Sequence, residues 1–136
     1  MTPTSETKLL ENFYAAINRN DIPAAVSYLH PEIERIEPGG DPAASTFRGH
    51  TEVTPHFVQA RNTWAEGSCN IERIIPSGEK FLVLVHVRVR LKNRSDWIEG
   101  RIADGFLFRE GLIVYFRTFV ERERGLAWAG IGNEAV

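Results

Sequence analysis

Cysteine is nearly missing from this sequence, because Cys69 is the only one among 136 residues. A single cysteine cannot form an internal disulfide, so we expect a buried thiol and a reducing, cytoplasmic compartment. No apolar run is longer than a strand, and the first residues lack the basic and apolar parts of a secretory signal. Four scattered histidines argue against a metal site, and without a glycine-rich phosphate loop we expect no cofactor.

An excess of one charge is missing too. Sixteen basic and 18 acidic residues give a net charge of -2, which offers no attraction for nucleic acid or an anionic membrane. The length and a 43% hydrophobic content suffice for one domain with its own core. We therefore expect a single domain over residues 1–136, in which residues 1–5 and 125–136 are candidates for loose ends.

Helical periodicity dominates the first half of the chain. A stripe from Glu6 to Asn18 predicts a first helix with Thr4 or Ser5 as N-cap. Asp21 caps a second helix that should stop near His30, because His30 precedes a proline. A short strand, 33–37, and the loop 38–42 follow. A third helix begins around Thr51, and its buried stripe includes Val53, Phe57 and Trp64.

The second half changes period. Segments 69–75, 80–91, 97–108 and 112–120 are rich in Val, Ile, Phe and Tyr and are separated by short turns. Short turns between consecutive strands predict an antiparallel meander. Helices followed by strands predict an α+β fold, with three N-terminal helices packed on one face of a curved antiparallel sheet. In the tail, Leu126 and Trp128 could dock, while Gly125 and Gly130 loosen it.

Three segments carry a resemblance to a known family. Residues 13–26, 47–50 and 106–113 resemble SnoaL-like polyketide cyclases and ketosteroid isomerases of the nuclear-transport-factor-2-like superfamily, in that family's order. The resemblance implies a cystatin-like α+β roll around a cone-shaped apolar pocket. The loop Pro38–Phe47 is long and without periodic structure, which predicts that the pocket opens near it. The superfamily contains isomerases, cyclases, dehydratases, epoxide hydrolases and non-catalytic domains, so the fold alone does not choose an activity.

The resemblance also points to catalytic residues. Glu37, followed by proline, falls where a ketosteroid isomerase has its catalytic Asp-Pro, and Asp104 resembles the acid/base of SnoaL-like cyclases. The isomerase's pocket tyrosine falls at Phe13, with Tyr14 next to it, which puts the full isomerase oxyanion hole in doubt. Thr118 stands where the epoxide hydrolases have an aspartate, which argues against that chemistry.

Even without the family resemblance, Asp104 is the most informative residue of the sequence. Its alternate neighbours Ile102 and Phe106 are apolar and share its strand face, where an unpaired acid is costly and its pKa should rise. The alternative is a structural ion pair with an arginine at position 88, 90 or 101. Glu37 lies either at the rim of the pocket or in a loop where its carboxylate is solvated.

The remaining candidates form the expected lining of the pocket. His56 could instead face solvent, Tyr14 could simply be packed, and Trp64 could belong to the core or to an interface. On the last strand we expect one face toward the pocket and the other, with Tyr115, Arg117 and Phe119, away from it. The predicted ligand-binding residues are Tyr14, Phe13, His56, Phe57, Trp64, Ile102, Phe106, Phe116 and Thr118.

These observations predict a protein that binds a small apolar molecule. As an enzyme, it would transfer a proton on a steroid-like or polyketide-like carbonyl compound without a cofactor. Asp104 is the first candidate for the acid/base and Glu37 for its partner, with Tyr14 and His56 as orienting groups. The alternative is a non-catalytic domain of the same fold that binds an apolar ligand or a protein. We also expect a homodimer through the outer sheet face, where Tyr115 and Phe119 are interleaved with Arg117.

Overall fold

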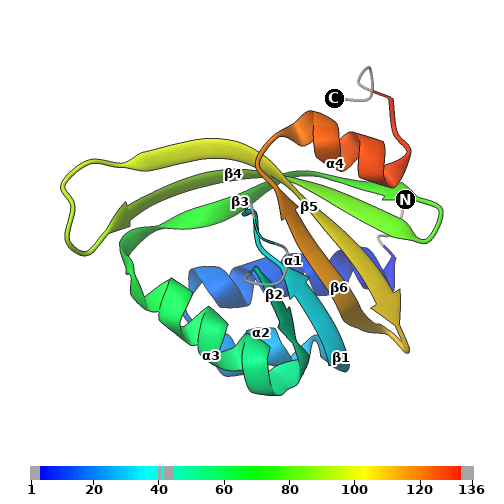
Figure 1. Ribbon diagram of the computed structural model, residues 1–136, viewed down its shortest axis with the longest axis horizontal. Coiled ribbons are helices and arrows are strands. Elements are labelled where there is room, and N and C mark those ends of the chain that lie inside the picture. Colours follow the sequence, from blue (N-terminus) through cyan, green and yellow to red (C-terminus); the bar gives the residue numbers. More distant parts are fainter. Residues whose placement is uncertain (1–3, 40, 42–44, 133–136) are drawn as a thin grey trace.

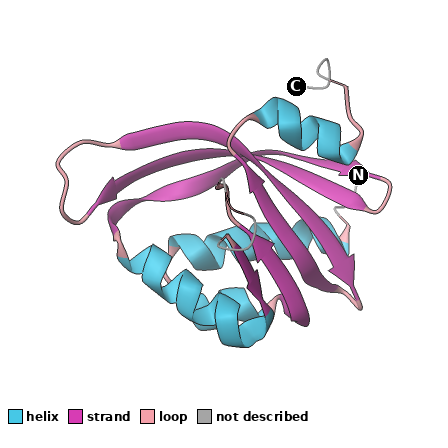
Figure 2. Cartoon of the chain, viewed as in Figure 1, coloured by secondary structure: helices cyan, strands magenta, loops and turns pink. Residues whose placement is uncertain are grey.

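The computed structural model describes residues 4–39, 41 and 45–132. Within these ranges the chain forms four helices and six strands (Figures 1 and 2). Their order is α1 (Ser5–Asn18), α2 (Ile22–Ser27), β1 (Leu29–Ile36), β2 (Thr46–Arg48), α3 (Gly49–Asn62), β3 (Trp64–Ser77), β4 (Lys80–Leu91), β5 (Ile98–Arg109), β6 (Leu112–Phe119) and α4 (Arg122–Ala129). The predicted α+β class is confirmed.

The six strands form one curved sheet in the order β2-β1-β6-β5-β4-β3. The meander from β3 to β6 is antiparallel throughout, as the short turns predict. β1 pairs antiparallel with β2 but parallel with β6, so the first strand of the chain closes onto the last. In Figure 1, helices α1, α2 and α3 lie on one side of the sheet and α4 lies on the other.

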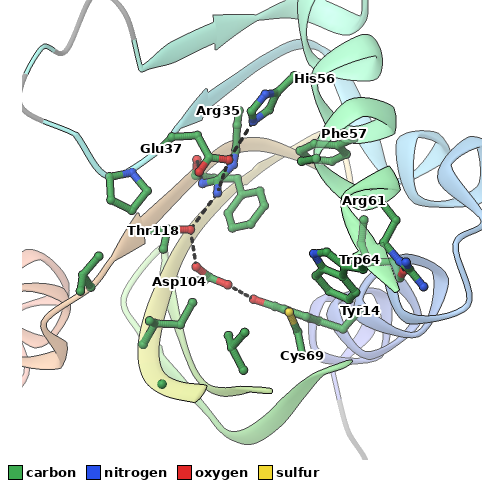
Figure 3. Close-up of a pocket in the computed structure, with 18 of the residues that line it drawn as sticks. Tyr14, Arg35, Glu37, His56, Phe57, Arg61, Trp64, Cys69, Asp104 and Thr118 are labelled. Atoms are coloured by element: carbon green, nitrogen blue, oxygen red, sulfur yellow. Dashed lines mark hydrogen bonds and ion pairs between the residues drawn. The ribbon is translucent and has the colours of Figure 1, made fainter. Parts of the chain in front are cut away.

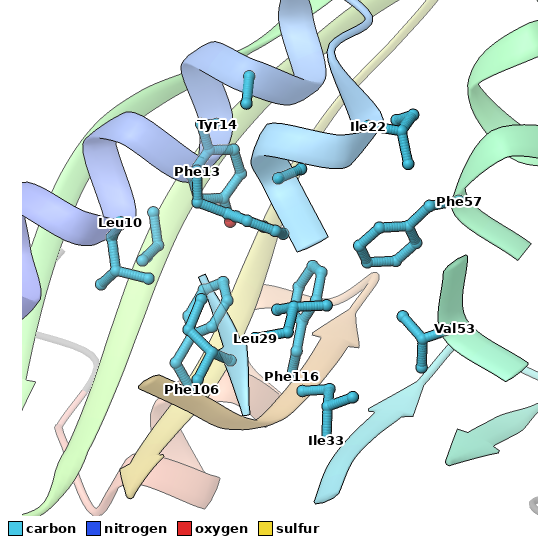
Figure 4. Close-up of a cluster of buried hydrophobic side chains, with 14 of the residues drawn as sticks. Leu10, Phe13, Tyr14, Ile22, Leu29, Ile33, Val53, Phe57, Phe106 and Phe116 are labelled. Atoms are coloured by element: carbon cyan, nitrogen blue, oxygen red, sulfur yellow. The ribbon is translucent and has the colours of Figure 1, made fainter. Parts of the chain in front are cut away.

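The larger core fills the space between the first three helices and the inner face of the sheet. Phe13 of α1 makes edge contacts with Phe106 and Phe116, and these two rings stack on each other with centroids 4.6 Å apart (Figure 4). Such aromatic pairs stabilise the core beyond the area they bury. Valines 83 and 85 of β4 belong to this cluster, so the valine face of β4 points inward.

Local signals for the helix starts are confirmed. The Thr4 side chain accepts a hydrogen bond from the amide of Thr7 at 3.1 Å, and Asp21 accepts one from the amide of Ala24 at 3.2 Å. Both bonds satisfy amides that have no partner within the helix.

Several predicted boundaries are wrong. α2 ends at Ser27, so His30 lies inside β1 and does not end a helix. α3 ends at Asn62, which places Trp64 at the start of β3. β3 pairs with β4 along almost its entire length, and this long-range pairing overrides the helical stripe that ran through Trp64. The strand β2 was not predicted.

The C-terminal segment is not a loose end over its described part. Gly125, Leu126 and Ala129 of α4 are buried on the outer sheet face, where they form a second core with residues of β4, β5 and β6. A Cβ atom on Gly125 would lie 2.8 Å from the Cβ of Ala103, so this glycine permits close packing. The other expected loose residues, 1–3 and 133–136, lie outside the described ranges.

α4 also covers the apolar part of the outer face. The Trp128 ring stacks on Tyr115 at 5.9 Å, and Phe119 is buried beneath the same helix. The premise that this aromatic face stays uncovered for a partner is therefore wrong, although the predicted orientation of Tyr115 and Phe119 is right. In the described ranges, no helix has both the length and the apolar character needed to cross a bilayer.

Candidate functional site

A cavity of about 400 Å³ lies between helices α1 and α3 and the inner face of the sheet. Its walls are mostly aromatic and aliphatic, as expected for a site that takes a small ligand. Ten of the eleven predicted site residues line it: Phe13, Tyr14, Glu37, His56, Phe57, Trp64, Ile102, Asp104, Phe116 and Thr118. The eleventh, Phe106, is fully buried behind Phe116 and does not line the cavity.

Asp104 of β5 is the most deeply buried acid of the cavity, with only 3% of its surface exposed. The Tyr14 hydroxyl donates a hydrogen bond to its Oδ2, and the Thr118 hydroxyl donates one to its Oδ1 at 2.6 Å (Figure 3). Thr118 faces Asp104 because the two residues are register partners of the antiparallel strands β5 and β6. Each carboxyl oxygen therefore has a donor, which offsets part of the cost of burial.

Arg35 of β1 joins this acid to the second acid of the cavity. One of its amino groups, Nη2, lies 2.9 Å from the Thr118 hydroxyl oxygen and 2.9 Å from the Glu37 carboxylate. The other, Nη1, donates to the carbonyl of Ile36 at 2.8 Å, and the guanidinium lies 3.8 Å from the centre of the Phe116 ring. Arg35 is thereby held on both edges and on one face.

Glu37 follows the end of β1 and contacts a histidine as well as Arg35. Its Oε1 accepts from Arg35 and lies 2.8 Å from the His56 Nε2 of α3, and the His56 ring stacks on Phe47 at 3.9 Å. Among the described residues no hydrogen bond or ion pair engages Oε2 of Glu37. Glu37 is thus a lining residue with an ion pair, and His56 faces the cavity and not the solvent.

The pKa values of the two acids move in opposite directions. Burial raises the pKa of Asp104, and the nearby charge of Arg35 and the hydrogen bonds from Thr118 and Tyr14 offset this only in part. Burial also acts to raise the pKa of Glu37, but Arg35 and His56 outweigh it and hold that pKa below its ordinary value. Burial, together with the Asp104 charge, raises the pKa of the Tyr14 phenol well above its usual range.

The structure corrects the assignment of the helix-α1 aromatic residues. Phe13 lines the cavity only with its ring and is packed into the aromatic core, whereas Tyr14 places its hydroxyl on Asp104. The hydroxyl that phenylalanine at position 13 lacks is thus present in the cavity on the adjacent residue.

The predicted alternative for Asp104 is wrong as well. Arg88 and Arg101 point to the outer face, where their partners are Glu99 and Glu72, and Arg90 pairs with Glu66. None of them contacts Asp104. His86 lies on the outer face too, bound to Glu99, as predicted from the valine face of β4.

Sequence reasoning missed Arg35, although a signal was present. Ile33 and Arg35 alternate on β1, so a strand that buries Ile33 must turn Arg35 to the same side. Because arginines are usually exposed, this alternation was not interpreted as a sign that Arg35 is buried. Arg35 is in fact only 6% exposed, and its Nε has no hydrogen-bond partner among the described residues.

The end of the cavity away from Glu37 is lined by a cation and a thiol. Arg61 of α3 donates to the carbonyls of Ile17 and Asn18 at 2.8 and 2.9 Å and lies over the Trp64 ring at 4.5 Å. Cys69 lines the same end, and burial with the Asp104 charge raises its pKa to about 12. A thiol with this pKa is neutral and not a nucleophile at physiological pH.

The predicted opening near the loop Pro38–Phe47 can be followed only in part. Pro38 lines the cavity, but residues 40 and 42–44 of that loop lie outside the described ranges. Among the described residues no group of three or more acidic, histidine or cysteine side chains is arranged to hold a metal ion.

Comparison with known proteins places this geometry in a family. The family model of the SnoaL-like domain matches residues 10–116, which is most of the chain. No curated protein matches the chain. An NTF2-like protein of unknown function from Burkholderia pseudomallei has a similar structure, with a TM-score of 0.75 and 22% identity over 92% of this chain and 97% of that one.

Two similar structures contain small molecules. TerC, co-crystallized with polyporic acid, gives a TM-score of 0.75 at 15% identity, and the match covers 93% of this chain and 99% of that one. A protein of ketosteroid isomerase-like fold from Catenulispora acidiphila, in complex with trimethylamine, gives 0.74 at 12% identity over 98% of both chains. At such identities the likeness concerns the fold alone. Together with the match over residues 10–116, it shows that the chain belongs to the SnoaL-like family.

Proposed function

We propose that the protein catalyses proton transfer on a small, largely apolar carbonyl compound. One observation carries the proposal: two carboxyl groups line the same apolar cavity, and their surroundings move their pKa values apart. Such divergence separates a base from an acid within one site. Ketosteroid isomerase works in this way, with a neutral aspartic acid as a hydrogen-bond donor. The steroid-like or polyketide-like class of the substrate is part of the proposal.

Glu37 is the proposed base. Its lowered pKa keeps it ionised at neutral pH, and its Oε2 is free of protein partners in the described part of the chain. In the proposed step, Oε2 takes a proton from the carbon next to the carbonyl, the C–H electron pair moves into the new C=C bond, and the carbonyl oxygen becomes an enolate. Return of that proton to another carbon completes an isomerisation.

Tyr14 is the proposed donor for the enolate oxygen, and Asp104 is the acid that orients it. Arg35 can only donate, so the Thr118 oxygen accepts from Arg35 and its hydroxyl proton must go to Oδ1 of Asp104. A proton on Asp104 therefore belongs on Oδ2, facing Tyr14. In that state Asp104 donates to the Tyr14 oxygen, and the Tyr14 hydroxyl is released to donate to a ligand oxygen.

Small-molecule ligands in similar structures support a ligand pocket here. TerC was co-crystallized with polyporic acid, and the Catenulispora acidiphila protein is in complex with trimethylamine. The aromatic lining of this cavity, including Phe57, Trp64 and Phe116, favours an apolar ring compound.

Deuterium exchange tests the proposal directly. 2-Tetralone and a β,γ-unsaturated bicyclic ketone are incubated with the protein in deuterated buffer, and exchange or conjugation is followed by NMR. We expect acceleration over buffer that falls about 10²–10⁴-fold in Glu37→Gln, which removes the base, and in Tyr14→Phe, which removes the donor to the enolate. Glu79→Gln, an exposed change in the turn between β3 and β4, serves as the control. Full activity in both pocket variants, or no acceleration of either ketone, would contradict the proposal.

A non-catalytic ligand-binding domain is the second candidate. It is favoured by the double ion pair of Glu37, because a carboxylate stabilised by Arg35 and His56 is a weaker base. This candidate predicts saturable binding of the same ketones, measured by calorimetry, without exchange of their α-protons.

A further inference from the structure

A second cavity, of about 460 Å³, opens where the parallel strands β1 and β6 separate. Their pairing ends at Ile36 and Arg117, after which β1 leads into Glu37 and Pro38 while β6 continues toward α4. The cavity lies in the resulting gap. Its walls come from these two strand ends, from β2 and from the first turn of α4.

The second cavity adjoins the first. Glu37, Pro38, Thr118 and Val120 line both, so a ligand held beside Glu37 can extend from one into the other. Val120 stands between them and is 63% exposed, the highest value among the large apolar side chains described as exposed. A ligand that crosses from the apolar cavity would cover this side chain, which removes apolar surface from water.

Arg117 gives the second cavity a positive charge without an ion-pair partner among the described residues, while each of the two acids that line it, Glu37 and Glu121, has an arginine neighbour. Arg117 is half-buried, its guanidinium lies 4.6 Å from the Phe119 ring centre, and its side chain has no ion pair or hydrogen bond among the described residues. Arg124 approaches Glu121 only to 3.9 Å, and both of those side chains are largely exposed. Such an exposed pair is weak and screened by salt. The charge of Glu37 is already engaged by Arg35 and His56.

We propose that the ligand carries an anionic group, a carboxylate or a phosphate, which Arg117 and Arg124 bind in the second cavity while its apolar part fills the first. Guanidinium groups bind both anions through charge-assisted hydrogen bonds. This inference rests on the small-molecule pocket of the proposed function and adds a substrate class to it: an apolar carbonyl compound with an acidic tail.

Displacement of a neutral dye tests the inference without any turnover. N-phenyl-1-naphthylamine fluoresces when it enters an apolar cavity, and three competitors that share one alkyl chain are compared: decanol, decanoate and decyl phosphate. We expect at least one of the two anions to displace the dye about tenfold better than decanol. A preference for decanoate identifies a carboxylate tail, and a preference for decyl phosphate identifies a phosphate.

Variants assign the preference to the two arginines. In the double variant Arg117→Gln with Arg124→Gln, the anion-to-alcohol ratio should fall to near one while the affinity for decanol stays within about twofold. The double variant Arg19→Gln with Arg94→Gln removes the same two charges at exposed arginines paired with Asp21 and Asp96, and it should leave the ratio unchanged. Equal potency of the alcohol and both anions on the unmodified protein, or a ratio that survives the double variant, would overturn the inference.

The two proposals fail separately. An anion preference that depends on Arg117 and Arg124, found together with no exchange of ketone α-protons, would refute the proposed catalysis and leave the second cavity as an anion site. Proton exchange without any anion preference would refute the anion site alone.

Discussion

At the scale of single residues, Arg35 determines how the two acids of the cavity behave together. It supplies charge to Glu37 directly and reaches Asp104 through the Thr118 hydroxyl. When Glu37 takes up a proton, the Arg35 charge loses its partner and favours ionised Asp104 more strongly. The two carboxyl groups are therefore expected to titrate as a coupled pair.

Replacing Arg35 tests this coupling. In Arg35→Met, the arginine no longer outweighs the burial of Glu37, so the pKa of Glu37 should rise. The pH below which an activity that needs ionised Glu37 declines should then shift upward. NMR titration of ¹³C-labelled glutamate measures this pKa independently of activity. Arg35→Lys, which keeps a charge without the planar fork, should give an intermediate pKa. An unshifted Glu37 in the methionine variant would show that Arg35 does not control it.

The Tyr14 hydroxyl is the other residue-scale determinant. Tyr14→Phe leaves Oδ2 of the buried Asp104 without its hydrogen-bond partner, which should cost about 1–3 kcal/mol in the free energy of unfolding. Tyr115→Phe is a matched control, because Tyr115 lies on the outer face against Trp128 and its hydroxyl makes no hydrogen bond to the described residues. Urea unfolding should show a change within about 0.5 kcal/mol for the control. An equally small change for Tyr14→Phe would mean that the buried bond adds no stability.

At the scale of elements, the packing of α4 depends on one glycine of the strand beneath it. A Cβ atom on Gly105 of β5 would lie 2.6 Å from the Trp128 ring, so Gly105→Ala must displace that ring. We expect a loss of about 1–3 kcal/mol in the free energy of unfolding. Gly100 lies in the same strand with nothing within 4 Å of an added Cβ. Gly100→Ala should therefore change the free energy of unfolding by less than about 0.5 kcal/mol. Thermal or urea unfolding of the two variants side by side decides the point, and equal stabilities would contradict the tight packing of α4.

Elements defined by local signals were predictable from the sequence. β4 has the predicted ends, Lys80 and Leu91, because alternating valines and flanking turn residues are both local features. The short strand β2 and the position of Trp64 were not predictable, because each depends on pairing with a strand that is distant in sequence. α4 was missed for a related reason: its glycines suggest looseness until the surface against which they pack is known.

The site was predictable to a similar degree. Alternation along β5 and the family resemblance together indicated Asp104, and the cavity contains ten of the eleven predicted residues. The positions of Phe106 and Arg35 could not be predicted from the sequence, because how deeply each side chain is buried depends on the packing between elements. The pairing of Tyr14 with Asp104, 90 positions apart, likewise follows only from the fold.

At the scale of the whole molecule, the outer sheet face divides into two parts. α4 covers the apolar part, and the rest carries ion pairs such as His86 with Glu99 and Arg101 with Glu72. The homodimer stays a prediction, and its contact on this face would now have to be polar. We therefore expect a dimer that weakens as salt rises, because exposed ion pairs are screened. Light scattering that gives the 15.4 kDa monomer mass at both low and high salt would contradict it.

The stability of the molecule against pH should reflect both acids, with opposite signs. The raised pKa of Asp104 means that its contribution is fully present below its unfolded pKa of about 3.9 and is lost as pH rises through the folded pKa. The lowered pKa of Glu37 means that its contribution is present above its unfolded pKa of about 4.3 and is lost as pH falls through the folded value.

Two variants separate these contributions in urea unfolding between about pH 3.5 and 8. Asp104→Asn replaces the buried acid by a neutral amide that can still accept from Thr118 and donate to Tyr14, so the fold should be kept. Relative to the unmodified protein, this variant should gain in free energy of unfolding as pH rises, because it has no buried carboxyl group to ionise. Glu37→Gln should behave in the opposite way, losing most at neutral pH, where the ion pairs with Arg35 and His56 are intact, and least in acid. A difference between Asp104→Asn and the unmodified protein that stays flat or falls with pH would place an ordinary, ionised aspartate in the cavity, and the Tyr14–Asp104 pair could then not act as the acid.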